Sequence, residues 1–253
     1  MIRKLLAIFL FVFSTKLLAV TVLIDPGHGG DDHGAKGNYK SGKKSLEVLE
    51  KDLTLSIAKK VKDLLSPHCH AYLTRSIDKT LSLEKRAEVA ETIKADLFIS
   101  IHVNSSRTAG AHGFETYYLD NHDDAAVRKV EEVENKMSGG EGEEIIIRQI
   151  LTDLVVSRTV TSSKALANSI HGELKKTLPR KFKLTDRGIR PGLFYVLALS
   201  KRPAVLLEAG FMSNDVELKK MSSEKFQDEY AKAIAQGVRD FIKVRFKPSV
   251  SLF

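Results

Sequence analysis

Three short apolar runs in this chain each lead to a side chain that can bind a metal or carry a proton. Val20–Ile24 runs into a glycine-rich loop that holds His28, residues 96–101 run into His102, and residues 203–207 run into Glu208. In an open parallel sheet, ligands and chemistry collect beyond the carboxyl ends of the strands. The pattern therefore predicts two imidazoles and a carboxylate at one sheet edge, which is the layout of a metal site.

Strand-like and helix-like segments alternate along the chain. Further strands are expected at residues 71–74, 113–119 and 193–197, and helices at Glu50, after Ser82, after Ser163 and around Phe226. This alternation is typical of βαβ units. We predict an α/β fold in a single domain over residues 20–246, with a mainly parallel twisted sheet, helices on both faces and a short tail at 247–253.

Residues 120–162 depart from this alternation. Their first half is acidic and is interrupted by Gly139, Gly140 and Gly142, whereas Ile145–Val156 is apolar with helical character. We interpret the segment as a helical insertion in the same domain.

The first 19 residues have the anatomy of a secretory signal peptide. A basic start precedes a continuous apolar run from Leu5 to Phe13, and Ala19 offers a small residue for cleavage. An uncleaved anchor is the alternative, although the stretch is short for a membrane span and contains Lys16. We expect an exported, periplasmic protein with no stable membrane span.

The chain is basic, with a formal net charge of +8. A basic surface suits an anionic polymer, which for an exported protein means cell-wall material or lipid head groups. No aromatic-rich basic stripe is present to stack bases, so the sequence argues against a nucleic-acid partner.

Zinc prefers nitrogen and sulfur ligands, often completed by one carboxylate. His28 and His102 supply nitrogen, and Glu50 fits as a third ligand because it opens the helix that follows the His28 loop. Glu47 is a rival, and an acidic residue in a first helical turn is also favoured by the helix dipole alone. Glu208 ends a buried strand, where it can act as a general base on a zinc-activated water, so the set predicts amide hydrolysis.

Five motifs occur in order: Asp25–Gly30, Glu50–Asp52, Thr74–Arg75, Ala95–Asn104 and Leu207–Asn214. Together they resemble the zinc-dependent N-acetylmuramoyl-L-alanine amidases of bacterial cell walls (AmiA/AmiB/AmiC-like) over essentially all of residues 20–246. The resemblance implies Zn²⁺ as cofactor, His28, Glu50 and His102 as its ligands, and Glu208 as the catalytic glutamate. It also implies peptidoglycan as substrate, cut between N-acetylmuramic acid and the L-alanine of the stem peptide.

In the cell-division members of that family, an inserted helix covers the zinc and is displaced by an activator protein. The insertion at 120–162 stands in the corresponding place. We therefore expect an autoinhibitory glutamate, one of Glu131, Glu132 and Glu134, at the open zinc position. A solvated acidic helix is the alternative.

Three residues near the predicted site are candidates for substrate contact: Asn104, Arg187 and Arg190. Arg86 is expected to pair inside the helix layer. The leading prediction is a periplasmic peptidoglycan amidase in wall remodelling or daughter-cell separation. A zinc peptidase that cuts within the stem peptide is the nearest alternative, and a non-catalytic wall-binding module is a third, against which Glu208 argues.

Overall fold

The structure is a computed structural model that describes residues 20–108, 110–121, 127–135 and 143–246, with backbone only at 143–150. The expected signal peptide and tail lie outside the described residues, as does part of the acidic half of the insertion.

Six strands form the central sheet in the order β4–β1–β5–β8–β6–β7. Their bounds are β1 Thr21–Pro26, β4 His70–Leu73, β5 Leu97–Asn104, β6 Phe114–Leu119, β7 Asp186–Gly192 and β8 Ala204–Phe211. All neighbouring strands run parallel except β6 and β8, which are antiparallel. The predicted α/β fold with a mainly parallel sheet is confirmed.

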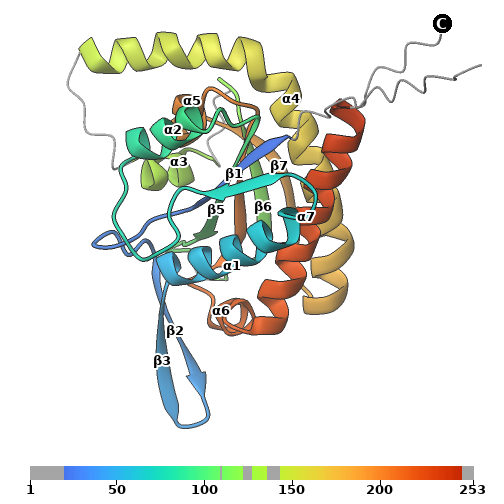
Figure 1. The fold of residues 1–253 in the computed structure, drawn as a ribbon. Helices are drawn as coiled ribbons and strands as arrows, with labels where there is room; N and C mark the ends of the chain where they lie inside the picture. The colour runs from blue at the N-terminus through green and yellow to red at the C-terminus, as the bar shows by residue number, and fades with distance from the viewer. Residues whose placement is uncertain (1–19, 109, 122–126, 136–142, 247–253) are drawn as a thin grey trace, which may run out of the picture.

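Helices cover both faces of this sheet (Figure 1). One face carries α1 (Glu50–Leu65), α7 (Glu224–Arg245) and the C-terminal part of α4 (Glu143–Phe182). The other carries α2 (Leu83–Thr92) and α5 (Tyr195–Ser200), with α3 (Arg128–Glu134) beside them. Because both faces are covered, β5 and β8 are buried at every position, which explains their continuous apolar runs.

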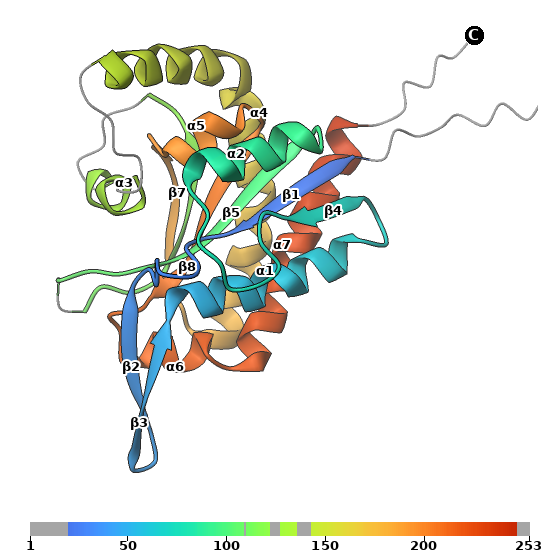
Figure 2. The same cartoon turned by 60° about the vertical axis from the view of Figure 1, so that its left-hand side comes forward.

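A hairpin of β2 (Lys36–Ser41) and β3 (Lys44–Leu49) projects from the body next to α6 (Asp215–Met221), as Figure 2 shows. No strand is predicted at these residues from the sequence. Its strands are largely exposed and carry too few apolar residues for the alternation that marks a half-buried strand.

Two predicted elements are wrong. Residues 193–197 are not a strand: the strand is β7, just before them, and α5 begins at Tyr195. A short apolar run has no periodicity that separates strand from helix, and β7 is a polar edge strand containing Pro191. The helix expected to start at Ser163 is instead the continuation of α4, which begins at Glu143.

Candidate metal centre

The loop after β1 holds His28 in a left-handed backbone conformation, with φ of 59°. Two buried arginines fix this loop through its carbonyl groups. Arg86 donates to the carbonyls of Pro26 and His28, both at 2.8 Å, and Arg75 donates to Pro26 at 3.1 Å and Gly27 at 2.8 Å. The position of the His28 imidazole is therefore set by the loop backbone, which Arg75 and Arg86 hold from other parts of the fold.

Arg86 also forms a buried ion pair with Asp25, at 2.7 Å between Nη1 and Oδ1. Thr74 and Ser100 donate to the same carboxylate at 2.6 Å and 2.9 Å. Burial alone would raise the pKa of Asp25, but the Arg86 charge and the Thr74 hydrogen bond bring that pKa below its ordinary value. Arg86 thus lies in the helix layer, on α2, but it pairs with Asp25 at the end of β1 and not with a partner inside that layer as predicted.

Glu50 and His102 reach the same point from α1 and β5. The Glu50 carboxylate accepts from the backbone amides of Ala35 at 2.8 Å and Val103 at 2.9 Å. The His102 ring lies against Gly27, where an added Cβ would stand 2.4 Å from the ring. A second glycine, Gly34, leaves room for the Glu50 carboxylate and the His28 ring. Glu47, the rival of Glu50, is exposed on β3.

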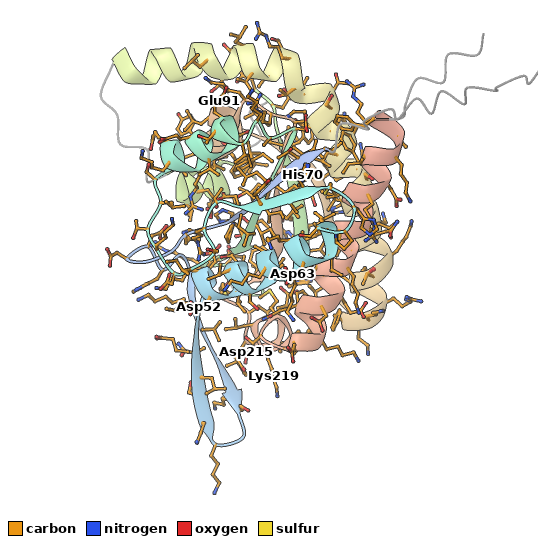
Figure 3. All side chains as sticks on the ribbon, viewed as in Figure 1. Asp52, Asp63, His70, Glu91, Asp215 and Lys219 are labelled. Atoms are coloured by element: carbon orange, nitrogen blue, oxygen red, sulfur yellow. The ribbon has the colours of Figure 1, made fainter. Side chains whose placement is uncertain are left out.

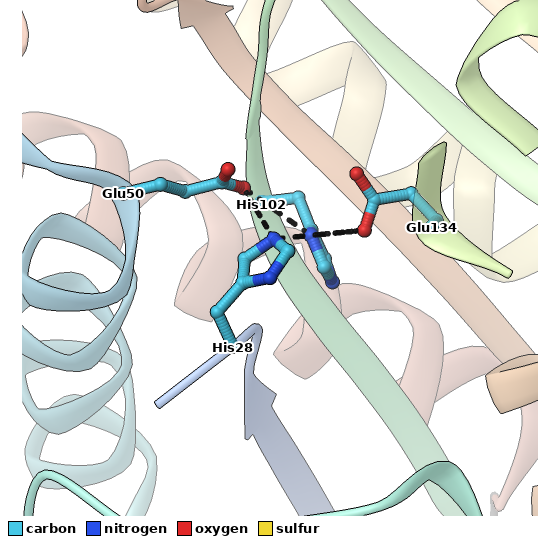
Figure 4. Close-up of side chains that lie close together, drawn as sticks. All are labelled: His28, Glu50, His102 and Glu134. Atoms are coloured by element: carbon cyan, nitrogen blue, oxygen red, sulfur yellow. Dashed lines mark ion pairs between the residues drawn. The ribbon is translucent and has the colours of Figure 1, made fainter. Parts of the chain in front are cut away.

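Four side chains converge here: His28, Glu50, His102 and Glu134, each offering one ligand atom within 4.8 Å of the others (Figure 4). Glu50 Oε1 lies 3.1 Å from His28 Nε2 and 3.3 Å from His102 Nδ1. Glu134 Oε2 lies 3.7 Å and 2.8 Å from the same two nitrogens. Four ligands about 2.0–2.1 Å from a tetrahedral zinc ion would stand about 3.3 Å apart.

The orientation of the rings fits a metal better than it fits hydrogen bonds. His28 Nε2 and His102 Nδ1 are both buried and lack a hydrogen-bond partner of acceptable geometry among the described residues. These two nitrogens lie near the carboxylate oxygens, but the ring orientations do not allow an N–H bond to point at an oxygen. Asp32 Oδ2 lies 2.8 Å from His28 Nδ1, which leaves Nε2 as the nitrogen that faces the cluster. The donor set therefore fits zinc, with two imidazoles and two carboxylates.

Charge in the cluster is strongly coupled. Burial works against protonation of His28, yet the Glu50 charge and the Asp32 hydrogen bond raise the His28 pKa to about 10. The pKa of Glu50 is correspondingly lowered, against the effect of burial, by the neighbouring histidines. A divalent cation would supply this positive charge while the imidazoles stay neutral, which is the form that binds metal.

Glu134 is supplied by α3, which is held by side-chain hydrogen bonds to the backbone of Leu193 and Tyr195, at the start of α5. Asn135, at the end of α3, donates to the Leu193 carbonyl at 2.8 Å and accepts from the Tyr195 amide at 2.9 Å. Glu131 accepts from the Leu193 amide at 2.5 Å, and Glu132 is exposed. Of the three candidate glutamates, the structure brings Glu134 alone to the cluster.

Glu208 lies next to His102 across the β5–β8 pairing. It is 1% exposed, and neither carboxylate oxygen has a hydrogen-bond partner among the described residues. Burial, reinforced by the charge of Glu134, raises the Glu208 pKa well above its ordinary value. An unpartnered buried carboxylate is costly, so its place beside the histidines requires a functional reason.

A cavity of about 210 Å³ opens beside the cluster. His28, His102 and Glu134 contribute to its wall, together with apolar side chains from three helices, Leu83, Val133 and Val196. A polar centre with apolar walls is the usual form of a small-molecule site.

Residues 22–240 match the model of a protein family described as N-acetylmuramoyl-L-alanine amidase. The chain belongs to the N-acetylmuramoyl-L-alanine amidase family.

The relatives agree with that assignment. The chain is 36% identical to the N-acetylmuramoyl-L-alanine amidase AmiA of Escherichia coli over 86% of its own length and 74% of the relative. It resembles the catalytic domain of CwlV, an amidase from Bacillus (Paenibacillus) polymyxa var. colistinus, at 35% identity with a TM-score of 0.64, covering 89% of this chain and 99% of that one. The CwlD amidase of Clostridioides difficile, solved in complex with the GerS lipoprotein, is 26% identical with a TM-score of 0.64, covering 89% and 99%. The predicted hydrolase is therefore confirmed.

The residues expected to contact the amidase substrate lie farther out. Asn104 ends β5 and Arg190 lies on β7, and neither lines the cavity described above. Arg187 donates to the buried carboxylate of Glu115 and stacks over Phe211, with 5.3 Å from its guanidinium to the ring centroid. Sequence reasoning missed Glu115, although it faces Glu208 across β6 and β8.

His171 is buried in α4, with 4% of its surface exposed. Its ring nitrogens lie 2.9 Å from Thr116 Oγ1 and 2.8 Å from Asp186 Oδ1. The face of α4 that carries Leu166, Ile170 and Leu174 packs on the sheet and brings the His171 ring against it.

Among the described residues, no helix combines the length and apolar character that a membrane crossing requires.

Proposed function

We propose that this chain is a zinc-dependent peptidoglycan amidase that hydrolyses the bond between N-acetylmuramic acid and the L-alanine of the stem peptide. The observation that carries the proposal is the convergence of His28, Glu50 and His102 on one point, with the unpartnered Glu208 beside them. Residues 20–246 would form the catalytic domain.

His28, Glu50 and His102 would hold the metal. A zinc ion bound there supplies a Lewis acid that acidifies a water molecule and polarises the amide carbonyl of the substrate. The protein's own contribution begins with orientation: Asp32 fixes the His28 ring, and the Ala35 and Val103 amides fix the Glu50 carboxylate.

Glu208 would move the proton. Its carboxylate accepts a proton from the attacking water and then delivers it to the leaving nitrogen of L-alanine. Burial and the charge of Glu134 raise the pKa of Glu208 well above its ordinary value, so this carboxyl group holds a proton readily. Removal of the Glu134 charge would lower that pKa, so the base form of Glu208 would become available when the site opens.

Glu134 would occupy the fourth ligand position in a resting state. Its carboxylate oxygen lies 2.8 Å from His102 Nδ1, where an incoming carbonyl or water would need space. An activator that pulls α3 away from Leu193 and Tyr195 would expose the site. The CwlD–GerS complex shows that a related amidase assembles with a second protein, which supports an activator here.

The place of action would be the cell wall outside the cytoplasm. Residues 1–19 would direct export to the periplasm, where the enzyme would act in wall remodelling or daughter-cell separation. The Escherichia coli relative, the N-acetylmuramoyl-L-alanine amidase AmiA, supports a cell-wall substrate.

Mass spectrometry of products from purified peptidoglycan tests the proposal directly. The full chain and a variant lacking residues 128–135 are incubated with sacculi, with and without a chelator. We expect free stem peptides that begin at L-alanine, in greater amount from the shortened variant and absent with chelator. Fragments cut inside the stem would identify a peptidase, and release that persists with chelator would exclude the zinc mechanism.

A further inference from the structure

The β2–β3 hairpin is joined at both ends to the candidate metal centre. Ala35, just before β2, donates its amide to Glu50 Oε2 at 2.8 Å and accepts from the Glu50 amide at 2.9 Å. Leu49, the last residue of β3, directly precedes Glu50. A ligand that contacts the hairpin is therefore held at a fixed position relative to the catalytic residues.

The hairpin and the facing helix carry an excess of positive charge. Lys36, Lys40, Lys43 and Lys44 are exposed on the hairpin, and α6 adds Lys219 and Lys220. Within the described part of the chain, none of these lysines forms an ion pair, whereas Lys51 and Lys60 elsewhere do. Unpaired cations gathered on one surface favour a polyanionic ligand.

Between the hairpin and α6 lies a groove of about 480 Å³. Its lining residues are Tyr39, Lys40, Asp215, Val216, Lys219 and Lys220. Figure 3 labels Asp215 and Lys219 on α6, close to the hairpin.

The groove has a fixed shape and an apolar floor. Gly37 packs so closely on α6 and the preceding loop that a Cβ there would stand 2.4 Å from the Met212 carbonyl and 2.6 Å from Leu218. Val216 is 59% exposed in the groove, and Leu46, which pairs with Tyr39, is 40% exposed. The floor is thus an aromatic ring with aliphatic neighbours, and the rim carries three lysines and one aspartate, Asp215.

This chemistry matches a saccharide that carries carboxylates. Sugar rings stack on an aromatic face, and lysines attract the carboxylates of stem peptides. Tyr39 lies four residues beyond Ala35 along an extended strand, so it is about 13 Å from Ala35, whose amide contacts the Glu50 carboxylate. A polymer repeat in the groove would be a neighbour of the repeat being cut.

We propose that the groove between β2 and α6 is an accessory binding surface for the peptidoglycan polymer, which holds a saccharide–peptide repeat adjacent to the one at the metal centre. This inference rests on the proposed function for the identity of its ligand. A flat anionic lipid surface would use the lysines but not the aromatic floor, so the polymer is favoured.

The test compares two double variants of the full chain with equal loss of charge. Lys40→Gln/Lys219→Gln alters the groove, and Lys59→Gln/Lys94→Gln removes two exposed, unpaired lysines on α1 and after α2. Cosedimentation with purified sacculi, repeated over a salt series, measures binding without requiring cleavage. Hydrolysis is then measured on sacculi and on a soluble N-acetylmuramoyl-peptide.

We expect the groove variant to bind sacculi about 3–10-fold more weakly than the control variant, with a shallower salt dependence. Its kcat/KM on sacculi should fall through KM, while hydrolysis of the soluble fragment stays unchanged. Equal sacculus binding by the two variants would overturn the proposal. A loss of kcat/KM on the soluble fragment as large as that on sacculi would also overturn it. So would a groove variant that binds anionic phospholipid vesicles more weakly but binds sacculi as well as the control variant does. Groove-dependent binding without release of stem peptides, even when residues 128–135 are also deleted, would instead refute the proposed function and leave the surface standing.

Discussion

The buried Arg86–Asp25 pair allows a prediction with a defined magnitude. Arg86 is 3% exposed and Asp25 1%, and they are 2.7 Å apart. Arg86→Met keeps much of the side-chain volume but leaves the Asp25 carboxylate buried without its cation. Breaking a buried pair in this way costs about 3–5 kcal/mol. For a domain of this size, about 2–4 °C is lost per kcal/mol, so Tm should fall by about 6–20 °C.

The pH dependence gives the prediction a sign. In the folded wild type the Asp25 pKa is lowered, so the pair stabilises the fold fully above the ordinary pKa of an aspartate, and that stability is lost only as pH falls below this value and through the lowered folded pKa. In Arg86→Met the same carboxyl group is buried without a cation, so its folded pKa rises. The difference in stability between wild type and variant should therefore shrink as pH falls from 7 towards 4.

Thr74→Val is the matched control, since it removes one hydrogen bond to Asp25 and leaves the cation in place. We expect a loss of about 1 kcal/mol. Urea unfolding of both variants at several pH values, with chelator present, measures the difference. A loss for Arg86→Met no larger than that for Thr74→Val, or a difference that widens in acid, would refute the reasoning.

Three further outcomes follow from the site. Glu134→Ala should raise basal turnover about 10-fold or more, because a contact to a charged group contributes about 1.5–3 kcal/mol. The control variant Glu132→Ala should leave turnover unchanged. Equal turnover of the two variants in kinetic assays would exclude Glu134 as a resting-state ligand. Gly27→Ala should weaken zinc binding about 10–100-fold in a competition titration, because its Cβ would displace the His102 ring, and Gly172→Ala, with open space around it, should not. Burial lowers the His171 pKa, against the Asp186 hydrogen bond, so the stability that neutral His171 contributes is lost as pH falls below about 6.5. The loss of unfolding free energy in His171→Gln, relative to wild type, should therefore be smaller at pH 5.5 than at pH 7.5. A loss that does not change with pH would contradict this.

The strand-end residues could be predicted because their positions follow from topology. His28, His102 and Glu208 each come after a buried apolar run, and parallel strands deliver their ends to one edge. Glu50 could be anticipated as the start of the next helix. The proximity of these residues was therefore available from the sequence, although their role as ligands and base remains a proposal.

Other features depended on tertiary packing that local patterns do not contain. β7 is polar and half-buried along most of its length, so it is recognisable as a strand only through its pairing with β6. His171 is buried because Thr116 and Asp186 satisfy its ring, and neither partner is near it in sequence. Glu134 was one of three equivalent candidates until the Asn135 and Glu131 contacts fixed the rotation of α3.

The central claim is that His28, Glu50 and His102 bind zinc while Glu208 moves the proton. Zinc content and amidase turnover, measured together on Glu50→Ala and Glu208→Gln, test it most directly. The account predicts that Glu50→Ala loses both zinc and turnover, whereas Glu208→Gln keeps one zinc ion per chain and loses turnover by about 100-fold or more. Stoichiometric zinc in Glu50→Ala, or full turnover in Glu208→Gln, would contradict it.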